Sequence, residues 1–168
     1  MMRFAALALL AAMAAAGCSS YSWKPSVPES MRTVSVPTMR NESDVTELGA
    51  VMSRQLLREF QREGTFSVRA VGDAALEIQG IVKKSSAASR GYDRRSGLKM
   101  ASYEMSAEVE ISVIDKRNGK VLVNNRIYVP TTSYTSGQDR TTAMRDASGR
   151  LADDLARRVV DDVVNLKW

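Results

Sequence analysis

The sequence contains no histidine and one cysteine, Cys18, among 168 residues. Without histidine and with a single cysteine, neither a histidine-based catalytic triad nor the usual zinc ligand sets can form. A glycine-rich phosphate loop following a strand is also missing. The acidic pairs Asp153-Asp154 and Asp161-Asp162 fall within a predicted helix, where adjacent side chains do not face each other, so we interpret them as solvated polar surface. We therefore expect a protein that is not an enzyme and that holds neither a metal nor a dissociable cofactor.

The amino-terminal stretch has the layout of a lipoprotein signal peptide. Arg3 precedes an uninterrupted apolar run over residues 4–16, and Ala15-Ala16-Gly17 stand directly before Cys18. The run is too short to span a bilayer, which needs about 20 apolar residues. We expect residues 1–17 to be removed and Cys18 to carry fatty acyl chains that anchor the protein to a membrane. The alternative is a plain signal peptide with an incidental cysteine.

Residues 18–30 form a predicted lipidated amino terminus and tether, because they are polar and contain Pro25 and Pro28. Ser19 stands where an inner-membrane retention signal would place aspartate, which favours the inner leaflet of the outer membrane by analogy with enterobacterial lipoproteins. Without Arg3, the chain has 23 basic and 19 acidic side chains. This mild excess does not indicate nucleic acid as a partner.

Hydrophobic periodicity predicts one domain over residues 31–168. A strand at 31–36 ends at Pro37, and Asp44 with Glu47 resembles the capping pair of a helix that ends at Gly64. The clearest alternation of apolar and polar residues lies at 102–114 and predicts a half-buried strand. The other predicted elements are extended segments at 66–69 and 75–84, a strand at 120–132 after the turn Asn118-Gly119, and a helix at 139–166.

Each predicted helix has one apolar stripe, and the strands have one apolar face. The stripes consist of Val45, Leu48, Met52, Leu56 and Phe60 in the first helix and of Met144, Ala147, Leu151, Leu155, Val159 and Val163 in the second. The predicted fold is therefore an α+β two-layer sandwich, with two helices on one face of a four-stranded mixed sheet in the order β-α-β-β-β-α. The helix between the first two strands makes that pair parallel, and the later strands are joined by hairpins.

The other face of the predicted sheet is polar. It is expected to contain Glu104, Glu108, Glu110, Asn124, Arg126 and Tyr128. Such a face meets water or a hydrated partner.

A basic segment at residues 83–99 concentrates much of the positive charge. It contains Lys83, Lys84, Arg90, Arg94, Arg95 and Lys99 against one acidic residue, Asp93. Its serine, alanine and glycine content predicts a loop between two strands, and a solvated hairpin tip is the simplest interpretation. The functional interpretation is that these cations bind phosphates, because guanidinium and ammonium groups are the standard phosphate donors. Arg126 is a weaker candidate for the same role.

The chain resembles the LptE family of lipopolysaccharide-assembly outer-membrane lipoproteins. The resemblance rests on the cysteine motif at Cys18, on VSVPTMRNES (34–43) leading into LGAVMSRQLLREFQREGTFSV (48–68), on IDKRNGKVLVNNR (114–126) and on the closing amphipathic helix. It implies a lipid-anchored protein at the periplasmic face of the outer membrane that plugs the lumen of the β-barrel translocon LptD. It also implies that the protein assists barrel assembly and binds lipopolysaccharide in transport. The resemblance does not place individual ligand-binding residues.

Two other functions are compatible with parts of the sequence. The opening strand, helix and strand also resemble outer-membrane lipoproteins of curli secretion and of penicillin-binding-protein activation, which are protein-binding modules. The second hairpin and final helix fit the assembly family better. A periplasmic enzyme would require a pocket with strongly perturbed carboxylate pKa values.

Overall fold

A computed structural model describes residues 27–92, 101–136 and 139–168. The signal peptide, Cys18 and most of the tether lie outside the described residues. Within the expected tether, the side chain of Val27 is buried in the core, so this residue packs on the domain.

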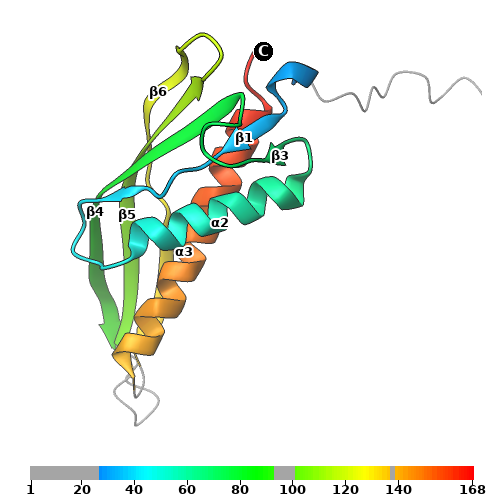
Figure 1. The fold of residues 1–168 in the computed structure, drawn as a ribbon. Helices are drawn as coiled ribbons and strands as arrows, with labels where there is room; N and C mark the ends of the chain where they lie inside the picture. Colours follow the sequence, from blue (N-terminus) through cyan, green and yellow to red (C-terminus); the bar gives the residue numbers. More distant parts are fainter. Residues whose placement is uncertain (1–26, 93–100, 137–138) are drawn as a thin grey trace, which may run out of the picture.

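The described elements form one seven-stranded sheet with two helices packed on one side (Figure 1). In chain order they are η1 (Glu29–Met31), β1 (Thr33–Ser35), β2 (Arg40–Asn41), α2 (Leu48–Glu63), β3 (Ser67–Val68), β4 (Leu76–Tyr92), β5 (Ala101–Asp115), β6 (Lys120–Tyr128), β7 (Thr131–Ser136) and α3 (Arg140–Val164). The sheet order is β3-β1-β4-β5-β6, while β2 also pairs with β4 and β7 with β5. The α+β class and the two helices are as predicted, whereas the expected four strands are wrong.

The additional strands arise where the chain returns to the sheet after leaving it and where a predicted strand is interrupted. The chain leaves the sheet after Ser35 and returns as β2, which pairs parallel with β4. The expected strand at 120–132 divides into β6 and β7 around Pro130, which has no N–H for a ladder bond. As predicted, the first strand pairs are parallel, and β4, β5 and β6 are antiparallel neighbours.

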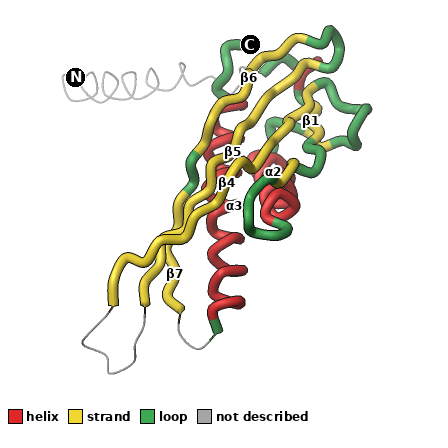
Figure 2. Tube along the Cα trace, turned by 90° about the vertical axis from the view of Figure 1, so that its left-hand side faces the viewer, coloured by secondary structure: helices red, strands yellow, loops and turns green. Residues whose placement is uncertain are grey.

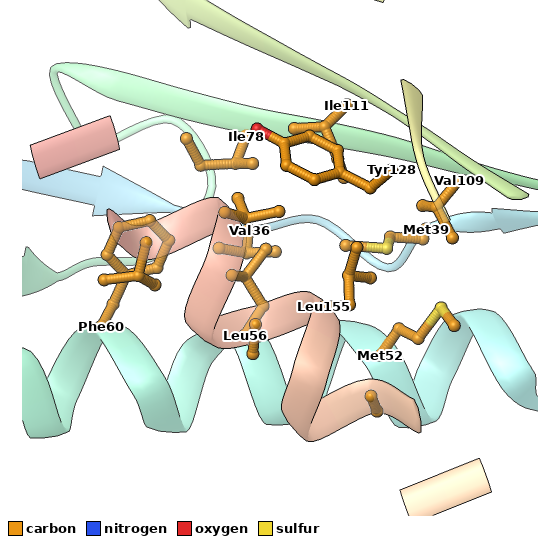
Figure 3. Close-up of a cluster of buried hydrophobic side chains, with 14 of the residues drawn as sticks. Val36, Met39, Met52, Leu56, Phe60, Ile78, Val109, Ile111, Tyr128 and Leu155 are labelled. Carbon is orange, nitrogen blue, oxygen red and sulfur yellow. The ribbon is translucent and has the colours of Figure 1, made fainter. Parts of the chain in front are cut away.

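The core lies between the helices and the sheet (Figure 3). Most of the predicted stripe residues are confirmed: Leu48, Met52, Leu56 and Phe60 of α2 are buried, as are Ala147, Leu151, Leu155, Val159 and Val163 of α3. Val45, which precedes α2, and Met144 are only partly buried. The predictions for the ends of the helices are only partly confirmed. Gly64 caps α2 in the left-handed region and Asp139 caps α3 by accepting a bond from the Thr141 N–H. The capping pair predicted at Asp44 and Glu47 is wrong, because Glu47 is itself left-handed and its side chain makes no cap bond.

A bulge in β6 reverses the faces of the residues that follow it. Ile111 pairs with Arg126 and Val113 with Val123, so β6 uses one more residue than β5 between these points. The extra length is taken up at Asn125, which has a φ of 42° and whose N–H donates to Ser112 Oγ at 3.0 Å. Beyond the bulge, Tyr128 is buried in the core, and Ile127 and Val129 are exposed.

The predicted polar face therefore needs a correction. Arg126 and Tyr128 do not lie on the outer face, because both bond to Asp162 of α3 on the helix side. Glu104, Glu108 and Glu110 keep the predicted orientation, since they alternate with the buried residues of β5.

Candidate functional site

Three predicted phosphate-binding cations lie on a strand. Lys83, Lys84 and Arg90 belong to β4, which continues to Tyr92 and pairs with β5 along its length. Lys83 and Lys84 therefore lie on a strand as predicted, whereas the loop expected after residue 84 is wrong for residues 85–92. The pairing explains the difference: serine and alanine are weak strand formers alone, but here each faces a residue of β5. Arg94, Arg95 and Lys99 lie outside the described residues.

The outer face of the β4–β5 hairpin carries a polar ladder, which we define as three cross-strand pairs. Lys84 Nζ lies 3.0 Å from Glu108 Oε2, the hydroxyls of Ser86 and Ser106 are 2.8 Å apart, and Arg90 pairs with Glu104. These pairs are well solvated, with the side chains of Lys84 and Arg90 75% and 63% exposed. Exposed ion pairs contribute only about 0–1 kcal/mol to stability. Lys84 and Arg90 can therefore leave their glutamate partners and bind another anion.

Lys83 belongs to a separate cluster at the edge of β4. Its Nζ lies 2.7 Å from Glu42 Oε2, and Arg40 contacts the other oxygen of the same carboxylate at 2.5 Å. The hydrogen bond from Lys83 holds the pKa of Glu42 below its usual value, and the same bond raises the pKa of Lys83. The cluster ties β2 to β4 on the solvent side.

Arg126 lies in a different environment from the other candidate cations. Its Nη1 donates to Asp162 Oδ2 at 2.9 Å, and the Tyr128 hydroxyl donates to the same oxygen at 2.7 Å. Burial and the bond to Asp162 raise the pKa of Tyr128 to about 12. The arrangement joins β6 to α3, which favours a structural role for Arg126, and it does not bring this residue together with Lys83, Lys84 and Arg90.

A groove that the sequence did not reveal runs past the amino-terminal ends of both helices. Its larger part has a volume of about 620 Å³ and a mixed lining of Val45, Leu48, Val51 and Met144 with Asp44, Glu47, Arg140 and Arg145 among its charged members. A smaller hollow of about 150 Å³ shares Asp44, Val45 and Met144 with it and continues to Ser85, Ser86, Ala87 and Met105. The groove therefore reaches β4. The only sequence signal for it is a pair of arginines flanking Met144 in the first turns of the second helix.

Among residues 27–92, 101–136 and 139–168, no group of three or more histidine, cysteine, aspartate or glutamate side chains is arranged to hold a metal ion. In the same residues, no helix combines the length and apolar character needed to cross a membrane.

Comparisons with known proteins point to one family. A family model described as "LptE: Lipopolysaccharide-assembly" matches residues 31–163. A search of curated protein sequences finds no significant match.

Two solved structures have similar folds. A hypothetical protein from Chlamydia trachomatis is 13% identical with a TM-score of 0.54, covering 80% of this chain and 96% of its own. A homolog of the neuraminyllactose-binding hemagglutinin from Helicobacter pylori is 12% identical with a TM-score of 0.53, covering 86% and 89%. At these identities the likeness concerns the fold alone.

Proposed function

The chain belongs to the LptE family of lipopolysaccharide-assembly proteins, and from this premise we propose that it is an outer-membrane lipoprotein that binds lipopolysaccharide on the polar ladder of β4 and β5. In this proposal the lipid on Cys18 anchors the protein at the periplasmic face. The domain occupies the lumen of an LptD-type β-barrel and assists its assembly. The family match across 31–163 is the observation that carries the proposal.

The polar ladder suits a ligand with several phosphates. Lys84 and Arg90 are mostly exposed and are held by single carboxylates, so a phosphate group competes with Glu108 or Glu104 at little cost in stability. Arginine offers paired donors to phosphate oxygens and lysine a compact charge. A hydrated polar face also suits a barrel lumen, because the interiors of outer-membrane barrels are polar. The protein then acts by contact and occupation, without a covalent step.

Arg94, Arg95 and Lys99 remain part of the proposal on charge alone. They follow Arg90 in the sequence and extend the same basic segment. Lys83 is a weaker member than Lys84, because its side chain is only 36% exposed and its ammonium is held by Glu42 between β2 and β4. Arg126 is the weakest, since Asp162 and Tyr128 hold it against α3.

The test is a binding assay with purified lipopolysaccharide and the double variant Lys84→Gln/Arg90→Gln. We expect binding to weaken several-fold and its salt dependence to become shallower, because two charges leave the contact. Arg62→Gln is the matched control, because Arg62 is also an exposed cation in a single ion pair, but on α2. Equal binding by the double variant and the control would remove the polar ladder from the proposal. All three proteins should unfold at nearly the same temperature.

A further inference from the structure

Among the described residues, no strand pairs with one edge of β4 over its second half. On the side opposite β5, β1 pairs with Leu76 and Glu77, and β2 pairs with Ile81 and Val82. From Lys83 to Tyr92, no described strand pairs with this edge, which lies along the outer margin of the sheet in Figures 1 and 2. Ten residues of strand span about 33 Å. The edge is therefore longer than an average strand.

The backbone geometry identifies which groups this edge presents. The Ala107 N–H donates to the Pro130 carbonyl at 3.3 Å, so the polar backbone groups of Ala107 point away from β4. Its partner Ser85 consequently directs its own N–H and C=O away from β5, toward the open edge. Alternation gives the same direction to Ala87 and Ser89, which pair with Met105 and Tyr103. Three N–H and three C=O groups thus line the edge.

The edge has few of the features that normally prevent pairing with another strand. Bulges lie at Val82/Lys84 and at Ser89/Gly91, and the stretch between them pairs regularly with β5. That stretch contains no proline, and its residues from Ser85 to Ser89 have small uncharged side chains. Unprotected edges of this kind are templates for an added strand.

The surroundings of the edge specify the chemistry of that strand. On the helix side, Ser85 and Ala87 border the 150 Å³ hollow whose other walls include Met105 and Met144. Alternate side chains of an added strand would lie over this hollow, where apolar groups fit. On the outer side, Lys84 and Arg90 are the outermost charged groups of the polar ladder, so acidic side chains would extend its alternation of charge.

A second copy of this chain fits the edge less well. Antiparallel pairing of two β4 strands about Ala87 would place Lys84 of each copy opposite Arg90 of the other. Like charges opposite each other destabilise a strand pair.

We infer that the edge of β4 from Lys83 to Arg90 binds an extended segment of a protein partner as an added strand, with acidic side chains outward and apolar side chains over the hollow. Main-chain hydrogen bonds supply affinity in this mode, and alternate side chains supply specificity. The inference uses the backbone of β4 and does not rest on lipopolysaccharide binding.

The probe is an end-blocked octapeptide of alternating glutamate and valine, added to the full chain in detergent. We expect saturable binding, with amide hydrogen exchange slowed at least tenfold at Ser85, Ala87 and Ser89. Ala87→Pro should weaken binding at least tenfold, because proline removes an edge-facing N–H at a position where an edge strand tolerates it. The matched control Ala87→Ser keeps that N–H, adds a single oxygen as at Ser85 and Ser89, and should bind like the wild type. Lipopolysaccharide binding should be the same in all three proteins, which separates this inference from the proposed function.

Two further probes keep the test decisive if Ala87→Pro fails to fold. The same peptide with alternate backbone N-methyl groups should not bind, because it cannot complete a strand ladder. A lysine and valine peptide should bind at least tenfold more weakly than the glutamate peptide. Binding of the N-methylated peptide would overturn strand addition, and equal binding of the lysine peptide would overturn the acidic partner. Protection of the edge amides that rises with protein concentration alone would assign the edge to a second copy and overturn the inference.

Discussion

Because the bulge at Asn125 reverses the faces of β6, truncation of two isoleucines in adjacent strands should change the free energy of unfolding by different amounts. Ile111 of β5 is 1% exposed in the core, whereas Ile127 of β6 is 58% exposed on the other face of the sheet. Truncating a buried isoleucine to alanine costs about 2–5 kcal/mol, from lost transfer free energy and the cavity left behind. We expect Ile111→Ala to fall in this range. Ile127→Ala should cost no more than about 1 kcal/mol, because over half of its side chain already contacts water.

The assay is urea unfolding of the two variants and the wild type, followed by circular dichroism at constant pH. With a slope of about 1–3 kcal/mol per molar urea, the Ile111 variant should lose at least about 0.7 M in midpoint. The Ile127 variant should unfold close to the wild type. Equal losses in both variants would refute the reversal of faces in β6. They would support the uninterrupted alternation of residues 121–129 that the sequence alone favours.

Three further predictions concern other parts of the molecule. Tyr128 has a pKa of about 12 in the fold against 10 when unfolded, so its contribution is complete below pH 10 and is lost as the pH rises toward 12. Wild-type stability should then fall by about 2–3 kcal/mol more than that of Tyr128→Phe over this interval, and parallel urea titrations of the two proteins would refute the assignment. Gly49→Ala should destabilise the protein, because the new Cβ would lie 2.5 Å from the Met39 carbonyl oxygen, while Gly149→Ala in α3 meets no atom within 4 Å and should stabilise by up to about 1 kcal/mol. Thermal unfolding that ranks these two variants in the opposite order would contradict the packing of α2 on the 39–41 segment. Cys18→Ala should move the protein from the outer-membrane fraction to the soluble periplasmic fraction, and quantitative recovery with the outer membrane would contradict the lipid anchor.

Local patterns predicted those parts of the fold that local physics determines. The stripe of α3 is continuous, its cap at Asp139 is a short-range hydrogen bond, and the start of the helix was predicted correctly. The same holds for the buried stripe of α2 and for Gly64 at its end. Each of these features depends on residues within one or two turns.

The features that the sequence did not predict depend on distant residues. The second half of β4 is a strand because β5 provides partners for it, including Ser106 and Glu108. The reversal in β6 depends on Ser112 of the neighbouring strand, which bonds to Asn125. Glu47 directly precedes α2 in a left-handed conformation, and the chain before it pairs with β4 at Arg40 and Asn41, a contact between distant segments.

Only part of the candidate site could be predicted, because the rest depends on residues that are distant in the sequence. Clustering of charge in the sequence found Lys84 and Arg90, and the structure gives each a glutamate partner on β5. Arg126 was assigned to the wrong face because the alternation was carried through the bulge. The groove beside Met144 joins segments around residues 45, 86, 105 and 144, which are adjacent only in the folded chain.

We propose that this LptE-family chain works by association with an outer-membrane barrel and with lipopolysaccharide. The decisive experiment is affinity capture of the lipidated protein from detergent-solubilised envelopes. We expect one heat-modifiable β-barrel protein to be recovered in equal amount, together with lipopolysaccharide. Recovery of a peptidoglycan synthase instead, or of no barrel protein at all, would contradict it.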